Sequence, residues 1–136
     1  MDEKTFKLEI VTPRKVIFSG EVESFSAPGV VGGFQVLYNH APMVSEIGIG
    51  IVKLRDASGK EVQYATSGGF VDVLKNQVTL LAETAEQARE IDIQRAEQAK
   101  ERAQKRLAER NMETDVDRAQ VALTRALNRL RVAQRG

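Results

Sequence analysis

The first half of the chain alternates apolar and polar residues with the period of two that is typical of half-buried strands. Phe6, Leu8 and Ile10 alternate with lysine and glutamate, and Thr12-Pro13 ends this run. Further strand candidates follow, each closed by glycine or proline. They are Val16–Phe18 (broken by Ser19-Gly20), a run with Val22 and Phe25 (closed by Pro28-Gly29), Phe34–Leu37, and a run in which Ile47, Ile49 and Ile51 alternate with other residues.

Two hairpins complete this half. Residues 56–59 read Asp-Ala-Ser-Gly and predict a turn between strands 51–55 and 62–66. Residues 75–77 predict a second turn, between a strand with Val71 and Val73 and a strand with Val78, Leu80 and Ala82. Short strands at this spacing, with no helix-length segment between them, favour a sandwich or barrel over βαβ units. We therefore expect a mainly β N-terminal sandwich over residues 1–86.

The second half has helical periodicity instead. Asp92 is placed to cap a helix that runs to about Arg110. Residues 111–114 predict a turn, after which Thr114 or Asp115 caps a second helix. The two apolar stripes are Ala96, Ala99, Ala103 and Leu107, and Val116, Ala119, Leu123, Ala126, Leu130 and Ala133. Two stripes of similar length joined by a short turn predict an antiparallel α-helical hairpin over residues 87–136.

Alanine dominates both stripes, which limits how strongly the helices hold each other. A buried methylene contributes about 0.8 kcal/mol, and alanine offers one methyl group. We expect a hairpin stabilised by a few kcal/mol at most. Two interpretations stay open: an arm that can leave its packing partner without melting, and a weakly held terminal hairpin with no switching role.

Composition and charge divide at the same place as the pattern. All seven aromatic residues and nine of the ten glycines lie at or before Phe70. Residues 1–86 carry 8 Lys+Arg against 11 Asp+Glu, net −3, whereas residues 87–136 carry 12 against 8, net +4. A basic tail on an acidic body suggests that the tail meets an acidic target. The N-terminus does not resemble a signal peptide, and no apolar run approaches the ~20 residues of a membrane span, so we expect no direct membrane insertion.

Catalytic and metal-binding patterns are missing from the sequence. It has no cysteine, a single histidine, and none of the common nucleophile, zinc or phosphate-loop motifs. His40, in a loop before Pro42, is better read as a structural or contact residue than as a general base. Gly32-Gly33 and Gly68-Gly69 are better read as turn or bulge glycines than as phosphate cradles. We therefore predict a non-enzyme that requires no cofactor or metal.

The basic tail does not favour a nucleic acid. Acidic residues alternate with its arginines through residue 117, and it has no aromatic residue to stack on bases. Many charges there are expected to form a solvated face with i,i+4 pairs such as Glu101–Lys105. Its last stretch is different, because no acidic residue separates Arg125, Arg129, Arg131 and Arg135. Such a group complements the helix dipole and can anchor carboxylates or phosphates.

The segment Ile91–Ala96 at the start of the first helix is the one motif with two chemical interpretations. Arg95 lies one turn after Asp92 and can pair with that carboxylate or with a ligand phosphate. Arg102 lies two turns further on, and an antiparallel hairpin returns Arg125 and Arg129 to the same end. Four guanidinium groups could then surround a small polyanion. The spacing alone favours the simpler interpretation, a helix cap with an i,i+3 ion pair.

Several stretches of the chain, in order from residue 11 to residue 130, together resemble one family, the epsilon subunit of bacterial rotary (F-type) ATP synthases. The stretches are Val11–Pro13, Asn39–Pro42, Ser67–Val73, Asn76–Glu83, Ile91–Ala96 and Ala126–Leu130. The resemblance implies a non-catalytic central-stalk subunit at the cytoplasmic face of the bacterial membrane, whose sandwich binds the gamma subunit and the c-subunit ring and helps couple proton flow to ATP synthesis.

The resemblance also implies a regulatory arm. The C-terminal helices would fold down on the sandwich or extend along gamma into the head, where basic residues meet the alpha and beta subunits and hinder ATP hydrolysis. The expected arm residues are Arg118, Arg125, Arg129, Arg131 and Arg135. ATP, as a regulatory ligand, would favour the folded hairpin. The ATP-site residues carried over from the family are Glu86, Ile91, Asp92, Arg95, Ala96, Arg102, Arg125 and Arg129.

One loop departs from the family pattern. Where the family has a loop close to Gly-Glu-Leu-Gly-Ile-x-Pro-Gly-His, Gly33 replaces the acidic residue and Tyr38-Asn39 replaces Pro-Gly. We therefore expect Tyr38 and His40 to make the c-ring or gamma contact. Two other function classes remain as alternatives: a nucleotide-sensing module whose main output is ATP binding, and a sandwich lectin or nucleic-acid module with an oligomerising hairpin.

Overall fold

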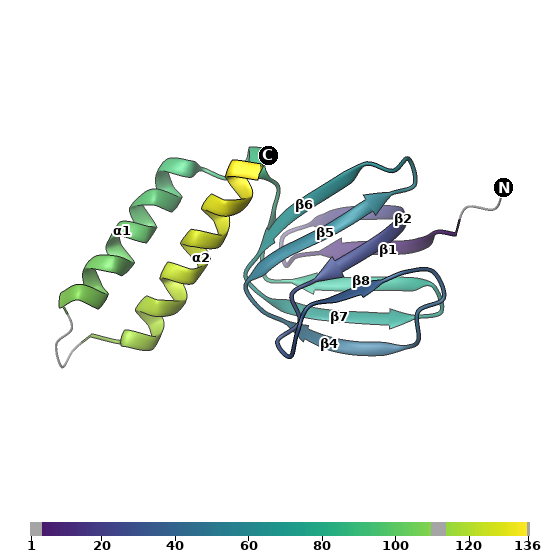
Figure 1. Cartoon of the computed structure of the whole chain (residues 1–136), viewed down its shortest axis with the longest axis horizontal. Coiled ribbons are helices and arrows are strands. Elements are labelled where there is room, and N and C mark those ends of the chain that lie inside the picture. The colour runs from purple at the N-terminus through teal and green to yellow at the C-terminus, as the bar shows by residue number, and fades with distance from the viewer. Residues whose placement is uncertain (1–3, 110–113, 136) are drawn as a thin grey trace. The chain divides into compact units, whose positions relative to one another are not determined.

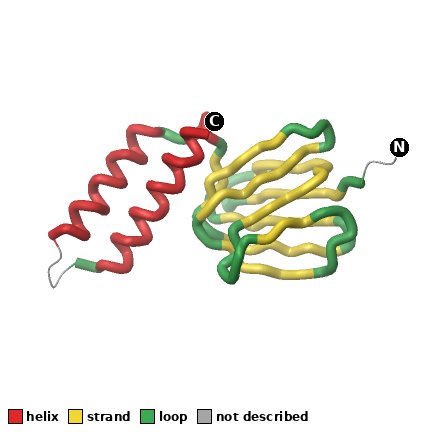
Figure 2. Tube along the Cα trace, in the orientation of Figure 1, coloured by secondary structure: helices red, strands yellow, loops and turns green. Residues whose placement is uncertain are grey.

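The chain folds into two compact units, residues 1–86 and residues 87–136. The computed structural model describes residues 4–109 and 114–135. Figures 1 and 2 show strands throughout the first unit and helices in the second. The prediction of a mainly β N-terminal sandwich and a C-terminal helical hairpin is confirmed.

The first unit contains the strands. Their bounds are β1 Phe6–Val11, β2 Val16–Ala27, β3 Phe34–Val36, β4 Met43–Ile47, β5 Gly50–Asp56, β6 Glu61–Thr66, β7 Gly69–Leu74, β8 Gln77–Ala82 and β9 Ala85–Glu86. They pair in the order β4-β7-β8-β1-β2-β5-β6-β9, with β3 on the second half of β2. The pair β1–β8 is parallel and the other pairs are antiparallel. The sheet folds over on itself, so inward side chains of both halves share one core that includes Phe6, Phe25, Val52 and Val71.

Strand β2 differs from the sequence prediction, which broke this region at Ser19-Gly20. Gly20 lies within the strand and pairs with Leu8 of β1. A register shift between Val22 and Ser24 then bends β2, so its first half pairs with β1 and its second half with β3 and β5. Glycine inside a strand is compatible with such a bend. One long strand therefore joins the two layers of the sandwich.

The alternating isoleucines after Glu46 do not form one strand. Ile47 ends β4, and Gly50 begins β5 after a connection of two residues. The Gly48 N–H donates to the Pro28 carbonyl at 2.9 Å. A side chain at Gly50 would come within 2.7 Å of Pro28. The close approach of Pro28 therefore accounts for the glycine at position 50, and the period of two across this turn is coincidental.

The predicted turn at residues 56–59 is present and is organised by one carboxylate. The Asp56 Oδ1 atom accepts from the Ser58 N–H at 3.0 Å, the Ser58 hydroxyl at 2.7 Å and the Lys60 N–H at 2.9 Å. These bonds, that from the Ser58 hydroxyl above all, lower the pKa of Asp56 below its ordinary value. The connection is thus held locally between β5 and β6.

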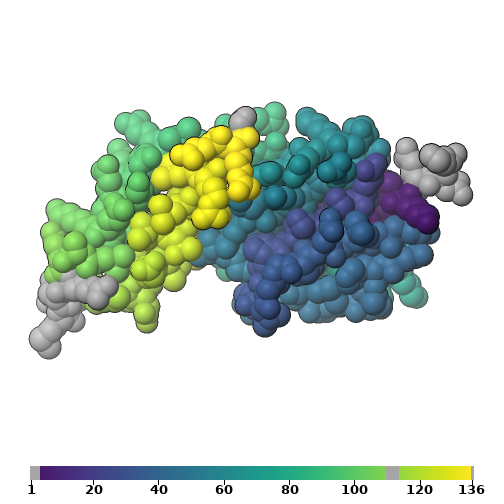
Figure 3. All heavy atoms as spheres, viewed as in Figure 1, coloured from purple at the N-terminus to yellow at the C-terminus, as the bar shows by residue number. Residues whose placement is uncertain are grey.

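The second unit begins with a short 3-10 turn, η1 Ala88–Glu90, followed by α1 Ile93–Glu109 and α2 Val116–Arg135. Figure 3 shows α1 and α2 in contact along their length, as the antiparallel prediction requires. The predicted helix end at Arg110 and the turn at 111–113 lie outside the described residues. The buried seam residues are Ala96, Ala103, Ala119, Ala126 and Leu130, while Ala99, Leu107, Leu123 and Ala133 are half-buried and Val116 is exposed.

The second helix also buries residues that the heptad pattern did not include. Asn128 and Val132 are both buried and lie one turn apart, off the predicted seam. Helix α2 contacts η1 as well as α1. The buried face of α2 is therefore wider than the single stripe that packing against α1 alone would bury.

Candidate ligand and partner sites

The Ile91–Ala96 motif starts α1, and Asp92 caps the helix as predicted. The Asp92 Oδ1 atom accepts from the backbone N–H of Arg95 at 3.1 Å, and the Asp92 carbonyl accepts from the Ala96 N–H at 3.0 Å. This is the usual N-cap arrangement, in which a carboxylate satisfies an N–H group that has no partner inside the helix. The motif therefore has a structural role that needs no ligand.

The other motif residues separate into a buried group and an exposed group. Ala96 is completely buried and Ile91 is nearly so. The side chains of Arg95, Arg102 and Arg125 are exposed, and that of Arg129 is half-buried. Because α2 runs antiparallel to α1, its C-terminal part lies beside the start of α1 (Figure 1), and the helices that carry these arginines are neighbours. Glu86, the remaining candidate, ends β9 in the other unit.

The arm arginines are mostly on the surface. Arg118, Arg131 and Arg135 are exposed, like Arg125, along α2. On α1, Lys100 Nζ lies 4.0 Å from Glu97 Oε2, an i,i+3 ion pair rather than one of the predicted i,i+4 pairs. Exposed pairs of this kind contribute little to stability. The surface of α2 thus presents cationic groups that a carboxylate-bearing partner can reach.

The loop between β3 and β4 holds the two predicted contact residues. Residues 37–40 form a hydrogen-bonded turn, in which the His40 N–H donates to the Leu37 carbonyl at 3.1 Å. The His40 ring nitrogen Nδ1 lies 2.7 Å from the Ala41 carbonyl oxygen. Tyr38 is exposed and His40 is half-buried. Their placement agrees with a contact role and shows no partner group for general-base chemistry among the described residues.

A row of exposed apolar side chains crosses the outer face of the sandwich, and sequence reasoning missed it. Phe70 is paired with Leu81, Leu81 with Val11, and Val11 with Val16. Phe70, Leu81 and Val16 are 55%, 56% and 57% exposed. We call these three residues, together with the half-buried Val11 that pairs with both Leu81 and Val16, the apolar row. Its signal was present in the sequence, because Phe70-Val71 and Leu80-Leu81 break the alternation with consecutive apolar residues.

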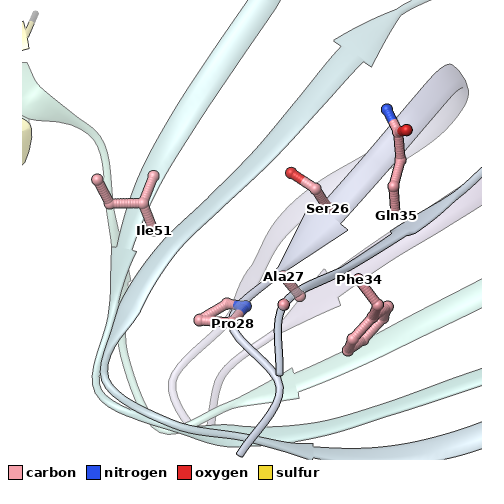
Figure 4. Close-up of a pocket in the computed structure, with 7 residues that line it drawn as sticks. Ser26, Ala27, Pro28, Phe34, Gln35 and Ile51 are labelled. Carbon is pink, nitrogen blue, oxygen red and sulfur yellow. The ribbon is translucent and has the colours of Figure 1, made fainter. Parts of the chain in front are cut away.

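A surface pocket of about 460 Å³ lies where β2 ends, beside β3 and the start of β5 (Figure 4). Ser26 and Gln35, which are paired across β2 and β3, give it a hydroxyl and an amide, while Phe34 and Ile51 give it apolar walls. None of its lining side chains is charged. It does not include any predicted ATP-site residue and offers no anchor for a phosphate.

Within residues 4–109 and 114–135, no three His, Cys, Asp or Glu side chains gather in a way that could hold a metal ion. Neither of the described helices is long and apolar enough to cross a bilayer.

Comparison with known proteins identifies the family of both units. Residues 5–88 match the family described as ATP synthase, Delta/Epsilon chain, beta-sandwich domain, and residues 89–134 match its long alpha-helix domain. The chain is 53% identical to the ATP synthase epsilon chain of Pelotomaculum thermopropionicum, with 98% of each chain covered. It is 54% identical to that of Salinibacter ruber, covering 97% of this chain and 93% of the relative.

Solved structures share the fold at lower identity. A chain of the Euglena gracilis mitochondrial ATP synthase superposes with a TM-score of 0.79 at 24% identity, covering 89% of this chain and 76% of that one. A chain of the Tetrahymena thermophila mitochondrial ATP synthase gives 0.55 at 13% identity, covering 99% and 98%. The sandwich, the helical hairpin and the two family matches together show that the chain belongs to the delta/epsilon chain family of ATP synthase, as an epsilon subunit, a non-catalytic part of the central stalk.

Proposed function

We propose that this subunit is a rotor component that helps couple proton flow to ATP synthesis and regulates ATP hydrolysis through its C-terminal hairpin. Its sandwich would bind the gamma subunit and the c ring, at the cytoplasmic face of the bacterial membrane. The observation that carries the proposal is the division of the chain into two compact units of opposite net charge, each of which matches its own domain of the family. The sandwich can therefore bind gamma and the c ring while the hairpin changes its conformation to regulate hydrolysis.

The apolar row is the surface we assign to gamma. Three of its four side chains are more than half exposed, and the row is aligned across four strands. Large apolar side chains exposed together in this way are unfavourable in water and mark protein contacts. The row lies on the outer face of a sheet whose inner face fills the core, so a partner can cover it without rearranging the sandwich. Tyr38 and His40, in the β3–β4 loop, are assigned to the c ring.

The hairpin is the regulatory arm. Its buried seam is largely alanine, so the helices lose little apolar burial when they separate, about 0.8 kcal/mol per methylene-sized group. The exposed guanidinium groups along α2 suit the acidic C-terminal segments of the alpha and beta subunits. Extension of the helices into the catalytic head would then hinder ATP hydrolysis.

Removal of residues 87–136 tests the arm directly. The truncated subunit should assemble into the complex, since the sandwich is a compact unit of its own, and ATPase activity should rise. Full-length variants in which Arg118, Arg125, Arg131 or Arg135 is replaced singly by Gln should raise activity in the same direction, while Arg106→Gln on α1 serves as the charge-matched control. Unchanged hydrolysis after truncation would leave only the coupling role.

The second proposal is that the hairpin binds ATP; if ATP binding is the main output of the protein, its function is nucleotide sensing. ATP binding is supported by arginines on neighbouring helices and by a capping carboxylate at the start of α1. Guanidinium groups bind phosphate through paired hydrogen bonds. Bound ATP would link α1 to α2 and favour the folded hairpin.

An ATP titration followed by amide NMR, with Mg²⁺ varied, tests this site. Saturable shifts within residues 86–129 that disappear in Arg95→Ala and persist in Arg106→Ala would support it. Normal binding in Arg95→Ala would remove the proposed site. An absence of shifts at millimolar ATP would mean that the motif serves as a helix cap only.

A further inference from the structure

Two asparagines from distant parts of the sandwich sequence bind each other through a pair of hydrogen bonds. The Asn39 backbone N–H donates to Asn76 Oδ1 at 2.7 Å, and Asn76 Nδ2 donates to Asn39 Oδ1 at 3.0 Å. Because a backbone N–H can only donate, the first bond fixes which end of the Asn76 amide faces Asn39. The Asn76 Nδ2 group is thereby left to donate the second bond, to Asn39 Oδ1. We call this pair the Asn clasp.

Asn76 occupies a position where turn geometry favours a different residue. Lys75 and Asn76 connect β7 to β8 with φ angles of 49° and 58°, as in a type I′ turn. Glycine is the preferred second residue of that turn, since it adopts positive φ without strain. Asn76 tolerates the conformation and also supplies the side chain for the clasp. A departure from the local preference that supplies a specific contact is typical of a functional position.

The clasp is anchored to the sheet on one side. The Asn76 carbonyl accepts from the Lys7 N–H at 3.0 Å, which extends the pairing of β1 with β8 by one bond. The Asn76 side chain therefore projects from a fixed point of the sandwich. It reaches the β3–β4 loop, which is 37 residues earlier in the chain.

On the other side the clasp holds the central part of the contact loop. Asn39 has φ 62° and is the third residue of the turn that the His40 N–H closes on the Leu37 carbonyl. Its neighbours are Tyr38 and His40, the proposed contact residues. The backbone N–H and the side-chain oxygen of Asn39 are both bonded to Asn76, so the backbone next to Tyr38 is held before any partner arrives.

We propose that the Asn clasp preorganises the Tyr38–His40 segment for contact with the c ring, and that Asn76 is a positioning residue for this contact. The inference rests on the proposed ring contact of Tyr38 and His40. Ordering a side chain in advance removes a binding cost that corresponds to about 2- to 12-fold in Kd. Loss of the clasp should therefore weaken binding without removing any atom that touches the ring.

The test measures the affinity of the full chain for ATP synthase depleted of this subunit. Asn76→Gly keeps the positive φ and removes only the side chain, and we expect Kd to rise about three- to tenfold. Gln77→Thr, next to it in β8, is the control and should bind like the parent.

Hydrogen exchange gives a second readout of the clasp. The backbone amide proton of residue 39 should exchange faster in Asn76→Gly than in the parent. It should stay slow in Asn39→Asp, because the backbone N–H and the side-chain oxygen of the aspartate keep both bonds to Asn76.

A double-mutant cycle separates positioning from general stability. In a background that carries both Tyr38→Ala and His40→Ala, Asn76→Gly should have little further effect on Kd, because the groups that it positions are gone. A full additive effect in that background would overturn the inference, as would parental affinity in Asn76→Gly when Tyr38→Ala alone weakens binding. If Tyr38→Ala and His40→Ala both bind normally, the ring contact itself is wrong, and the inference fails with it.

Discussion

The Asp92 carboxylate caps α1 by accepting the backbone N–H of Arg95 at 3.1 Å, so these two motif residues are joined through the backbone and not through the guanidinium group. The spacing predicts a helix cap with an i,i+3 ion pair as the simple interpretation; the cap is present, and the ion pair is not among the contacts of the described residues. The observed bond satisfies a free N–H of the first helical turn. It gives Asp92 a structural role that is separable from any role in ATP binding.

Asp92→Ala should destabilise the start of α1. Loss of a capping carboxylate costs about 1 kcal/mol, and amide exchange of the first turn of α1 measures it. Asp92→Asn keeps a capping oxygen and should exchange like the parent. If both variants lose the same protection from amide exchange in the first turn of α1, the negative charge beside the helix N-terminus, and not the hydrogen bond, is the stabilising feature.

The strands and helices were predictable because each buries one face, and that burial leaves a period in the sequence. The alternation of Phe6, Leu8 and Ile10 is an example, since all three enter the core. The errors arose where a distant segment decides the local structure. Gly20 remains in β2 because β1 pairs with it, and the chain turns after Ile47 where the Pro28 segment approaches.

The candidate sites were only partly predictable for the same reason. Spacing located the Asp92 cap, and the family resemblance located the Tyr38–His40 loop; both are local features of the sequence. The apolar row depends on the register of four strands, and the Asn clasp joins two loops that no local pattern relates. Asn128 was also missed, because a heptad pattern assigns a polar residue to the surface.

Gly69→Ala should strongly destabilise the sandwich. A Cβ atom at Gly69 would clash with the Leu81 carbonyl oxygen across the β7–β8 pair, and the φ of 152° disfavours any side chain. We expect a loss of about 3 kcal/mol or more in the free energy of unfolding, measured by urea denaturation. Gly59→Ala is the control, since its φ is 87° but nothing lies within 4 Å; it should lose only about 1–2 kcal/mol. Similar losses in the two variants would contradict the clash.

Stability should fall in acid as the Asp56 carboxylate is protonated. Hydrogen bonds from Ser58 and Lys60 lower the pKa of this group in the folded state. The stabilisation is therefore present above the unfolded value of about 3.9 and is lost as the pH falls through the lower folded value. NMR titration of the Asp56 carboxyl group should give a pKa below that of an unstructured peptide, and Ser58→Ala should move it back upward. A normal pKa in the parent would exclude this contribution.

Leu81→Ser should weaken binding to the gamma subunit while leaving the sandwich folded. The Leu81 side chain is mostly exposed, so its removal should change the free energy of unfolding by no more than about 0.5 kcal/mol. At the centre of an interface, loss of such an anchor costs about 1–2 kcal/mol, or roughly 5- to 30-fold in Kd. Leu74→Ser is the matched control, because Leu74 is similarly exposed at the far end of β7, outside the apolar row. Binding of purified gamma to each full-length variant, by calorimetry, measures the difference. Equal affinities for the two variants would show that gamma docks elsewhere on the subunit.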